Sequence, residues 1–179
     1  MERIPETLYN VSMFVSLKRF VFNNMIDLLP STCFSYRRFI LALMHVRTAK
    51  SAKVNAGFRV YGTGDVVIGE DAWVGKNCTF YTMPDVCVFI GARCDIGPET
   101  TFNCQTHEMG SSEHRAGTCR FHDIRVGNGV WLGTRSVILC SSIGDGAVIG
   151  AGSVVLDDVP DNALCAGNPA EFKKILPSF

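Results

Sequence analysis

Two patterns of hydrophobic residues divide the chain into unlike parts. Residues 7–29 and 35–47 carry apolar residues at helical spacing and are separated at Pro30, so they predict two helices. From about Val54 onward this spacing stops, and an aliphatic residue, usually followed by glycine, recurs every six positions. A period of six fits neither a helix, which repeats every ~3.6 residues, nor a plain strand, which repeats every ~2. The chain is therefore predicted to be helical first and repetitive afterwards.

The repeats predict a solenoid in which each repeat supplies one short strand. The aliphatic residue points inward and stacks on its copy in the next coil, so the hydrophobic core runs along the axis. Small residues occupy the fifth place of the repeat, where we interpret Cys78 and Cys94 as core residues. Glycine follows the aliphatic residue at Ile68, Val74, Ile90, Ile96, Val126, Leu132, Ile143 and Ile149.

The repeat is interrupted between Phe102 and Val126, where the sequence is polar and has almost no pattern. We expect this stretch to leave the coil as an extended loop over residues 106–121, and long loops on rigid scaffolds usually carry function. The organisation that follows is a helical segment (1–53), a β-helix domain (54–160) and a C-terminal tail (161–179). The tail is predicted to turn at Gly167-Asn168-Pro169 and to end in a short helix.

Charge separates the same two parts. The chain has 17 basic and 17 acidic residues, so its net charge is zero, which argues against a dedicated nucleic-acid binder. Residues 1–53 hold eight basic and three acidic groups, however, and the remainder holds nine and fourteen. Two interpretations of the basic, apolar start remain open. It is either a helical cap on the open end of the solenoid or a peripheral surface for a membrane or a lipid-linked substrate.

Cysteine usage and the N-terminal sequence indicate the compartment. The eight cysteines include no Cys-x-x-Cys pair, which makes zinc ribbons and redox motifs poor fits. Glu2 and Glu6 precede the first apolar stretch and no small-residue cleavage site follows it, so we expect no signal peptide. Lys18, Arg19 and Asp27 interrupt the stretch and exclude a membrane crossing. We predict a reduced, cytoplasmic protein, with the inner face of the membrane as an alternative location.

Several motifs together resemble the hexapeptide-repeat acyltransferases. They are the repeats, the Thr106-His107 loop, the step from Gly127 to Gly133 around Trp131, and the ending Ala166-Gly167-Asn168-Pro169-Ala170. The similarity is to the maltose and galactoside O-acetyltransferase type and to enzymes that acetylate bacterial polysaccharides, and it covers roughly residues 54–176.

The resemblance implies an all-β solenoid that winds as a left-handed parallel β-helix and assembles as a homotrimer. The six-residue period itself does not reveal handedness. Active sites would lie between neighbouring subunits, with acetyl-CoA as the acyl donor along the solenoid and a sugar or glycan as the acceptor.

Transfer of an acetyl group from a thioester to a hydroxyl needs a base, and an imidazole titrates in the right range. His107 opens the long loop and stands 24 residues before Trp131. The resemblance implies that His107 is the general base. Its orienting partner would be Glu108, Glu113 or a backbone carbonyl.

The same resemblance assigns the substrate contacts. Asn77 matches an asparagine that places the acceptor hydroxyl, although an asparagine at a solenoid corner can also be a turn residue. Asp85 is a weaker candidate on the acceptor side. Trp131 would pack beside the pantetheine arm. Backbone groups at Gly133, Ala151 and Gly152 would bind the pantetheine amides, and Lys173 or Lys174 would contact the coenzyme A phosphates.

The sequence therefore predicts an acetyl-CoA-dependent O-acetyltransferase that acts on a sugar, in polysaccharide or glycan biosynthesis. An N-acetyltransferase acting on a nucleotide-linked amino sugar is the first alternative, because a histidine base serves amines equally well. A non-catalytic scaffold would leave the Thr106-His107 loop without a purpose. A γ-type carbonic anhydrase would need three zinc-binding histidines, and the spacing of His107, His114 and His122 does not match that family, so no metal is expected.

Overall fold

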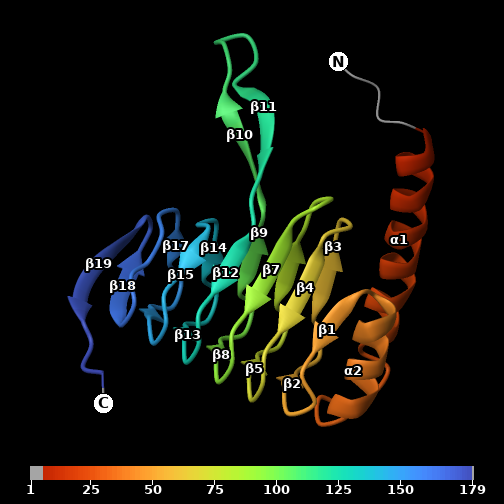
Figure 1. Ribbon diagram of the computed structural model, residues 1–179, viewed down its shortest axis with the longest axis horizontal. Helices are drawn as coiled ribbons and strands as arrows, with labels where there is room; N and C mark the ends of the chain where they lie inside the picture. The colour runs from red at the N-terminus through yellow and green to blue at the C-terminus, as the bar shows by residue number, and fades with distance from the viewer. Residues whose placement is uncertain (1–5, 179) are drawn as a thin grey trace.

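The computed structural model describes residues 6–178, with side chains from residue 13 onward. It shows a β-solenoid of parallel strands with two helices at its N-terminal end (Figure 1). Helix α1 spans Glu6–Met25 and helix α2 spans Phe34–Leu43. The predicted all-β solenoid with an N-terminal helical segment is therefore confirmed. Its first strand, β1, already begins at Val46, within the stretch predicted to be helical.

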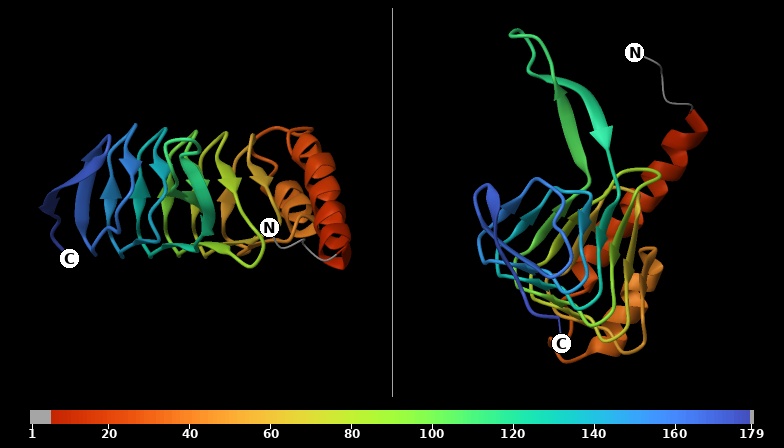
Figure 2. Two further views of the ribbon diagram at one scale, coloured as in Figure 1. Left: turned by 90° about the horizontal axis from the view of Figure 1, so that it is seen from above. Right: turned by 60° about the vertical axis from the view of Figure 1, so that its left-hand side comes forward.

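Three parallel sheets form the faces of the solenoid, here called faces A, B and C. Face A consists of β1 (Val46–Thr48), β4 (Asp65–Ile68), β7 (Cys87–Ile90), β12 (Ile124–Val126) and β15 (Ser142–Ile143). Face B consists of β2 (Lys53–Val54), β5 (Trp73–Val74), β8 (Asp95–Ile96), β13 (Trp131–Leu132), β16 (Val148–Ile149), β18 (Ala163–Gly167) and β19 (Ala170–Ile175). Face C consists of β3 (Arg59–Tyr61), β6 (Thr79–Tyr81), β9 (Thr101–Asn103), β14 (Val137–Ile138) and β17 (Val154–Val155). Each coil visits the faces in this order and winds left-handed along the axis (Figures 1 and 2).

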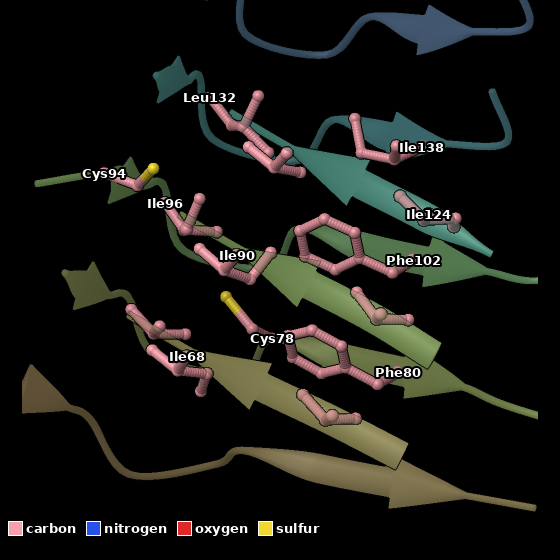
Figure 3. Close-up of a cluster of buried hydrophobic side chains, with 14 of the residues drawn as sticks. Ile68, Cys78, Phe80, Ile90, Cys94, Ile96, Phe102, Ile124, Leu132 and Ile138 are labelled. Atoms are coloured by element: carbon pink, nitrogen blue, oxygen red, sulfur yellow. The ribbon is translucent and has the colours of Figure 1, made fainter. Parts of the chain in front are cut away.

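The core is a set of ladders in which each inward side chain stacks on its counterpart one coil away. Phe58, Phe80 and Phe102 are fully buried, and their ring centroids lie 4.8 and 4.6 Å apart. Cys78 and Cys94 are also fully buried beside such ladders (Figure 3), which confirms their interpretation as core residues. The six-residue period therefore reflects a buried apolar position that recurs on each of the three faces in turn.

Two buried arginines fasten the helices to the open end of the solenoid. The guanidinium of Arg19 donates to the carbonyls of Gly62 and Gly64, each at 2.7 Å, and that of Arg37 donates to the carbonyl of Val54 at 2.9 Å. Burial lowers the pKa of Arg19 to about 10, so it stays charged at neutral pH. Each arginine satisfies carbonyls that the first coil leaves without a strand partner.

The segment predicted as the loop 106–121 is a two-stranded hairpin, here called the arm. Strands β10 (Gln105–Met109) and β11 (Ala116–Phe121) pair antiparallel, and the arm projects away from the coils (Figures 1 and 2). The chain enters it from face C and leaves it to face A, so it rises from the edge between these faces. Beneath it the ladders continue without a break, since β7 pairs with β12 and β9 with β14.

The short C-terminal helix predicted from the sequence is wrong. After β18 the chain reverses at Gly167, whose φ is +119°, and β19 returns antiparallel to β18 (Figure 1). The physical reason is that β18 would otherwise leave an unpaired edge at the end of face B. Covering this edge supplies strand hydrogen bonds that a helix would forgo.

Candidate functional site

His107 lies on the arm, and a backbone group holds its ring. Its Nδ1 is 3.1 Å from the carbonyl oxygen of Gly117 on the opposite strand. Because a carbonyl can only accept, Nδ1 carries the hydrogen in this contact, and Nε2 of the neutral ring keeps its lone pair. Of the three orienting partners that the sequence left open, the structure therefore places a backbone carbonyl beside His107.

The two glutamates have other positions. The carboxylate of Glu108 accepts from Nε of Arg120 at 2.9 Å and also from its Nη2, across the two strands of the arm. Arg120 is the register partner of Thr106, whereas His107 faces Cys119. The contact with Arg120 therefore places Glu108 on the opposite face of the arm from His107. Glu113 is exposed in the turn of the arm, where its backbone N–H donates to Ser111.

A groove of about 550 Å³ runs along the outside of face B. Three residues predicted to contact the acyl donor line it: Trp131, Gly133 and Ala151. The indole of Trp131 is 59% exposed, so its ring is available to a ligand. The remaining lining residues are Trp73, Asp95, Ile96, Gly97, Pro98, Thr134, Val148, Ile149, Gly150 and Leu164. Apolar walls with a few polar groups are typical of sites for elongated organic ligands.

Close packing of successive coils shapes the floor of this groove. A Cβ added to Gly133 would lie 2.3 Å from the backbone nitrogen of Ala151 in the next coil. Gly97 is equally crowded, because its Cβ would lie 2.5 Å from the nitrogen of Thr134. These glycines let the coils approach each other and leave backbone at the surface of the groove.

Asn77 and Gly152 lie at the corner between faces B and C. Asn77 has a positive φ of 60° and Gly152 one of 70°, so both adopt the left-handed conformation that this corner requires. Asn77 is exposed, and its side-chain oxygen covers Gly57 of the preceding coil. The conformation agrees with the turn-residue interpretation and leaves the amide accessible to a substrate.

The two candidate phosphate-binding lysines lie on β19, at the C-terminal end of face B. Lys174 pairs with Leu164, which lines the groove, whereas Lys173 lies at a register shift and contacts Glu171 at 3.1 Å. Lys174 is thus the lysine whose register partner belongs to the groove.

The structure brings Trp131, Gly133 and Ala151 together but separates them from His107. The arm rises from the edge between faces C and A, whereas the groove lies on face B, the remaining face (Figure 1). A single chain therefore presents His107 and the groove on different sides of the solenoid.

Sequence reasoning missed the aromatic partner of Trp131 on face B. Trp73 is 42% exposed and lines the same groove, two strands away, with Asp95 between the two indoles in register. The signal was present, because Ala72-Trp73-Val74 and Val130-Trp131-Leu132 place tryptophan at the same position of the repeat.

Two kinds of site are absent from residues 6–178. No helix there has both the length and the apolar character that a membrane crossing requires. Nor does that part of the chain place three or more histidine, cysteine or acidic side chains where they could hold a metal ion.

Comparison with known proteins connects these features to a family. The family described as bacterial transferase hexapeptide (six repeats) matches residues 123–157. The putative colanic acid biosynthesis acetyltransferase WcaF of Escherichia coli is 29% identical over 79% of this chain and 75% of its own length. The putative acetyltransferase SACOL2570 of Staphylococcus aureus is 30% identical over 75% of this chain and 67% of its own.

Solved structures show the same architecture. A galactoside acetyltransferase in complex with coenzyme A superposes with a TM-score of 0.70 at 25% identity, and the match covers 90% of this chain and 80% of that one. The coverage extends beyond the repeats, so the similarity includes more than the solenoid coils.

Proposed function

Because the chain belongs to the hexapeptide-repeat acetyltransferases, we propose that it transfers an acetyl group from acetyl-CoA to a hydroxyl of a sugar, in the synthesis of a polysaccharide or glycan. The observation that carries this proposal is the face-B groove, which holds Trp131, Gly133 and Ala151 in one continuous surface. Relatives named for colanic acid and galactosides support a sugar as the acceptor.

The groove receives the donor. Its apolar walls and exposed indole suit the pantetheine arm. Backbone groups of Gly133 and Ala151 in the groove, with Gly152 at the adjoining corner, meet the pantetheine amides. Lys174, whose register partner Leu164 lines the groove, is the better placed lysine for the coenzyme A phosphates, with Lys173 next to it.

His107 activates the acceptor. With Nδ1–H bonded to the Gly117 carbonyl, Nε2 takes the proton of the sugar hydroxyl as the oxygen attacks the thioester carbon. The tetrahedral oxyanion collapses, the carbon–sulfur bond breaks, and the imidazolium returns the proton to the coenzyme A thiolate. Backbone N–H groups in the cleft stabilise the oxyanion, and Asn77 orients the acceptor hydroxyl.

A homotrimer completes this site. Since the arm and the groove lie on different sides of one chain, the His107 of one subunit serves the groove of its neighbour. Sedimentation should give the mass of three chains, whereas a stable, active monomer would contradict the arrangement.

The helical segment provides a surface for the membrane. Met13, Phe14, Leu17 and Val21 are 44–60% exposed on the side of α1 that faces away from the coils. Among residues 13–53, the one acidic side chain, Asp27, already pairs with Arg59 at 2.6 Å. The other charged side chains of this stretch that reach the surface are basic. Arg47, Lys50 and Lys53 are exposed, Arg47 being paired with Asp65, and Lys18 and Arg38 are partly exposed. Apolar and basic groups together favour an anionic lipid surface.

Vesicle co-sedimentation tests this contact. Binding should require anionic phosphatidylglycerol over phosphatidylcholine, weaken with salt, and fall strongly in Phe14→Ser/Leu17→Ser. Leu156→Ser, an exposed leucine at the far end of the solenoid, is the matched control. Equal binding by both variants would refute the membrane surface. The cytoplasmic location stays a prediction.

The acetyl transfer itself is tested with acetyl-CoA and a panel of sugars, oligosaccharides and nucleotide-linked amino sugars. Products are read by mass spectrometry, since eight free cysteines would disturb a thiol-based assay. Wild type should acetylate a hydroxyl, and His107→Ala should lose ~10²–10⁴-fold in rate. Labelling of amino groups alone would favour the N-acetyltransferase alternative, and equal rates in both proteins would overturn the role of His107.

A further inference from the structure

Two tyrosines form an exposed aromatic surface on the outside of face C. Tyr61 and Tyr81 are register partners on adjacent coils, and each is 46% exposed. Their ring centroids lie 5.4 Å apart with an interplanar angle of 18°, so the rings stack along the solenoid axis. Neither ring belongs to the core, and the proposed donor groove lies on a different face.

At its N-terminal end this surface borders a hollow of about 300 Å³ between α1 and β3. Phe20, which is 69% exposed, and Tyr61 provide its aromatic walls. Ser16, Asn24 and Arg59 add polar groups to its lining. The side-chain nitrogen of Asn24 donates to the carbonyl of Phe20 at 2.7 Å, which leaves its side-chain oxygen to accept from a ligand.

At its other end the surface reaches the root of the arm. Asn103 is the register partner of Tyr81 on the next coil, and its side-chain oxygen accepts from the backbone N–H of Gln105, the first residue of β10. His107 follows two residues later, so ~13 Å of extended chain separates it from Asn103. The row Tyr61, Tyr81, Asn103 therefore leads from the hollow towards the catalytic histidine of the same chain.

The chemistry of this row matches a carbohydrate chain. A sugar ring presents C–H groups on its faces and hydroxyls at its rim, so it stacks on an aromatic face while its hydroxyls bond to neighbouring polar groups. Because the two rings stack on each other, each offers a sugar its outer face and its exposed edge, and Asn24, Arg59 and Asn103 lie beside them.

We propose that Tyr61 and Tyr81, with the hollow beside α1, bind the part of a glycan acceptor that extends away from the acetylated sugar. This inference rests on the proposed function. It makes the enzyme selective for oligosaccharide or polymer acceptors over single sugars, because a monosaccharide at His107 does not reach the row.

The experiment compares acceptors of increasing length, from monosaccharide to hexasaccharide, built from whichever sugar the panel identifies. For wild type, kcat/KM should rise at least about tenfold with length. Tyr61→Ala and Tyr81→Ala should remove most of that rise, with the monosaccharide rate and the KM for acetyl-CoA unchanged. Tyr61→Phe and Tyr81→Phe should retain it, since they keep the ring face.

Phe172→Ala, which removes an exposed ring from β19, is the matched control and should leave the length dependence intact. Saturation-transfer NMR with the same oligosaccharide panel, without acetyl-CoA, separates the two proposals. Tyrosine-dependent binding without acetylation would support the row and refute the acetyl transfer. If acetylation does not depend on acceptor length, or if the alanine variants leave the length dependence unchanged, only the proposal for Tyr61 and Tyr81 is overturned. If the protein neither binds nor acetylates any oligosaccharide, both proposals are overturned.

Discussion

The Nδ1 atom of His107 and the carbonyl oxygen of Gly117 lie 3.1 Å apart across the two strands of the arm. The contact fixes the ring with backbone alone, so no acidic side chain is needed to choose the tautomer. It also ties the orientation of the imidazole to the pairing of β10 with β11. Whatever keeps the two strands paired thereby keeps the imidazole in position.

Glu108→Gln tests whether the pair with Arg120 orients the base or merely holds the arm. Because both side chains are about half exposed or more, the pair contributes at most ~1 kcal/mol. We expect less than tenfold loss of kcat and an unchanged pH–rate profile. Arg120→Gln should have the same effect, and the double variant no more than either. A loss as large as that of His107→Ala would instead make Glu108 part of the catalytic machinery.

Trp131→Ala should weaken binding of the donor. The indole is largely exposed, so its removal costs little folding free energy, while the groove loses its main aromatic wall. We expect the KM for acetyl-CoA to rise about tenfold with a smaller change in kcat, measured by steady-state kinetics. Trp73→Ala, in the same groove but packed at 6.0 Å against Phe34 of α2, is the comparison and should also lower stability. An unchanged KM in Trp131→Ala would remove the indole from the donor site.

Gly133→Ala should destabilise the solenoid. The new methyl would lie 2.3 Å from the nitrogen of Ala151, and two packed coils would have to separate to admit it. Such overpacking costs ~1–3 kcal/mol in chemical denaturation, and donor binding should weaken with it. Gly129→Ala is the control, because its Cβ meets nothing within 4 Å and only its left-handed φ of 65° opposes the change. Equal costs for the two variants would show that coil contact at Gly133 is unimportant.

Buried thiols make the fold sensitive to alkaline pH. Burial raises the pKa of Cys78, Cys104 and Cys140 from the ordinary 9.0 to about 12. The unfolded chain therefore loses these protons first, and the stability that is intact below pH 9 falls as the pH rises towards 12.

The same burial should protect these thiols from reagents. At pH ~8, a disulfide reagent should modify Cys33 and Cys119 quickly and the three buried thiols only after unfolding. Uniform reactivity of all the cysteines in the native protein would contradict the buried positions of Cys78, Cys104 and Cys140.

The coils could be predicted because each repeat of a solenoid buries an apolar residue at the same position. Ile68, Val74 and Phe80 are buried on faces A, B and C at intervals of six residues, so their spacing directly reflects the architecture. The sequences of the arm and β19 have no such periodic apolar residue. Most of their side chains are exposed, so no alternation distinguishes strand from loop or helix. Whether these segments form strands depends on a partner strand with a free edge, which the local sequence does not reveal.

Individual candidate residues could be named from the sequence, but their arrangement in space could not. The repeat places Trp131, Gly133 and Ala151 on one face, where they share a groove. Their spacing in the sequence already indicates this shared face. Strand pairing in the arm turns Glu108 away from His107. This pairing cannot be predicted from a polar segment that has no hydrophobic pattern. The separation of His107 from the groove depends on which edge of the solenoid the arm leaves.

The unbroken ladders beneath the arm have a consequence for how such an enzyme can be altered. Strand β7 pairs directly with β12, and β9 pairs directly with β14, although the arm lies between them in the sequence. The strand pairing of the core therefore does not depend on the arm. Arms of other lengths and sequences can be grafted at this joint while the donor groove stays intact. The arm that carries His107 can thus be varied as a separate module, without redesigning the coils that line the face-B groove.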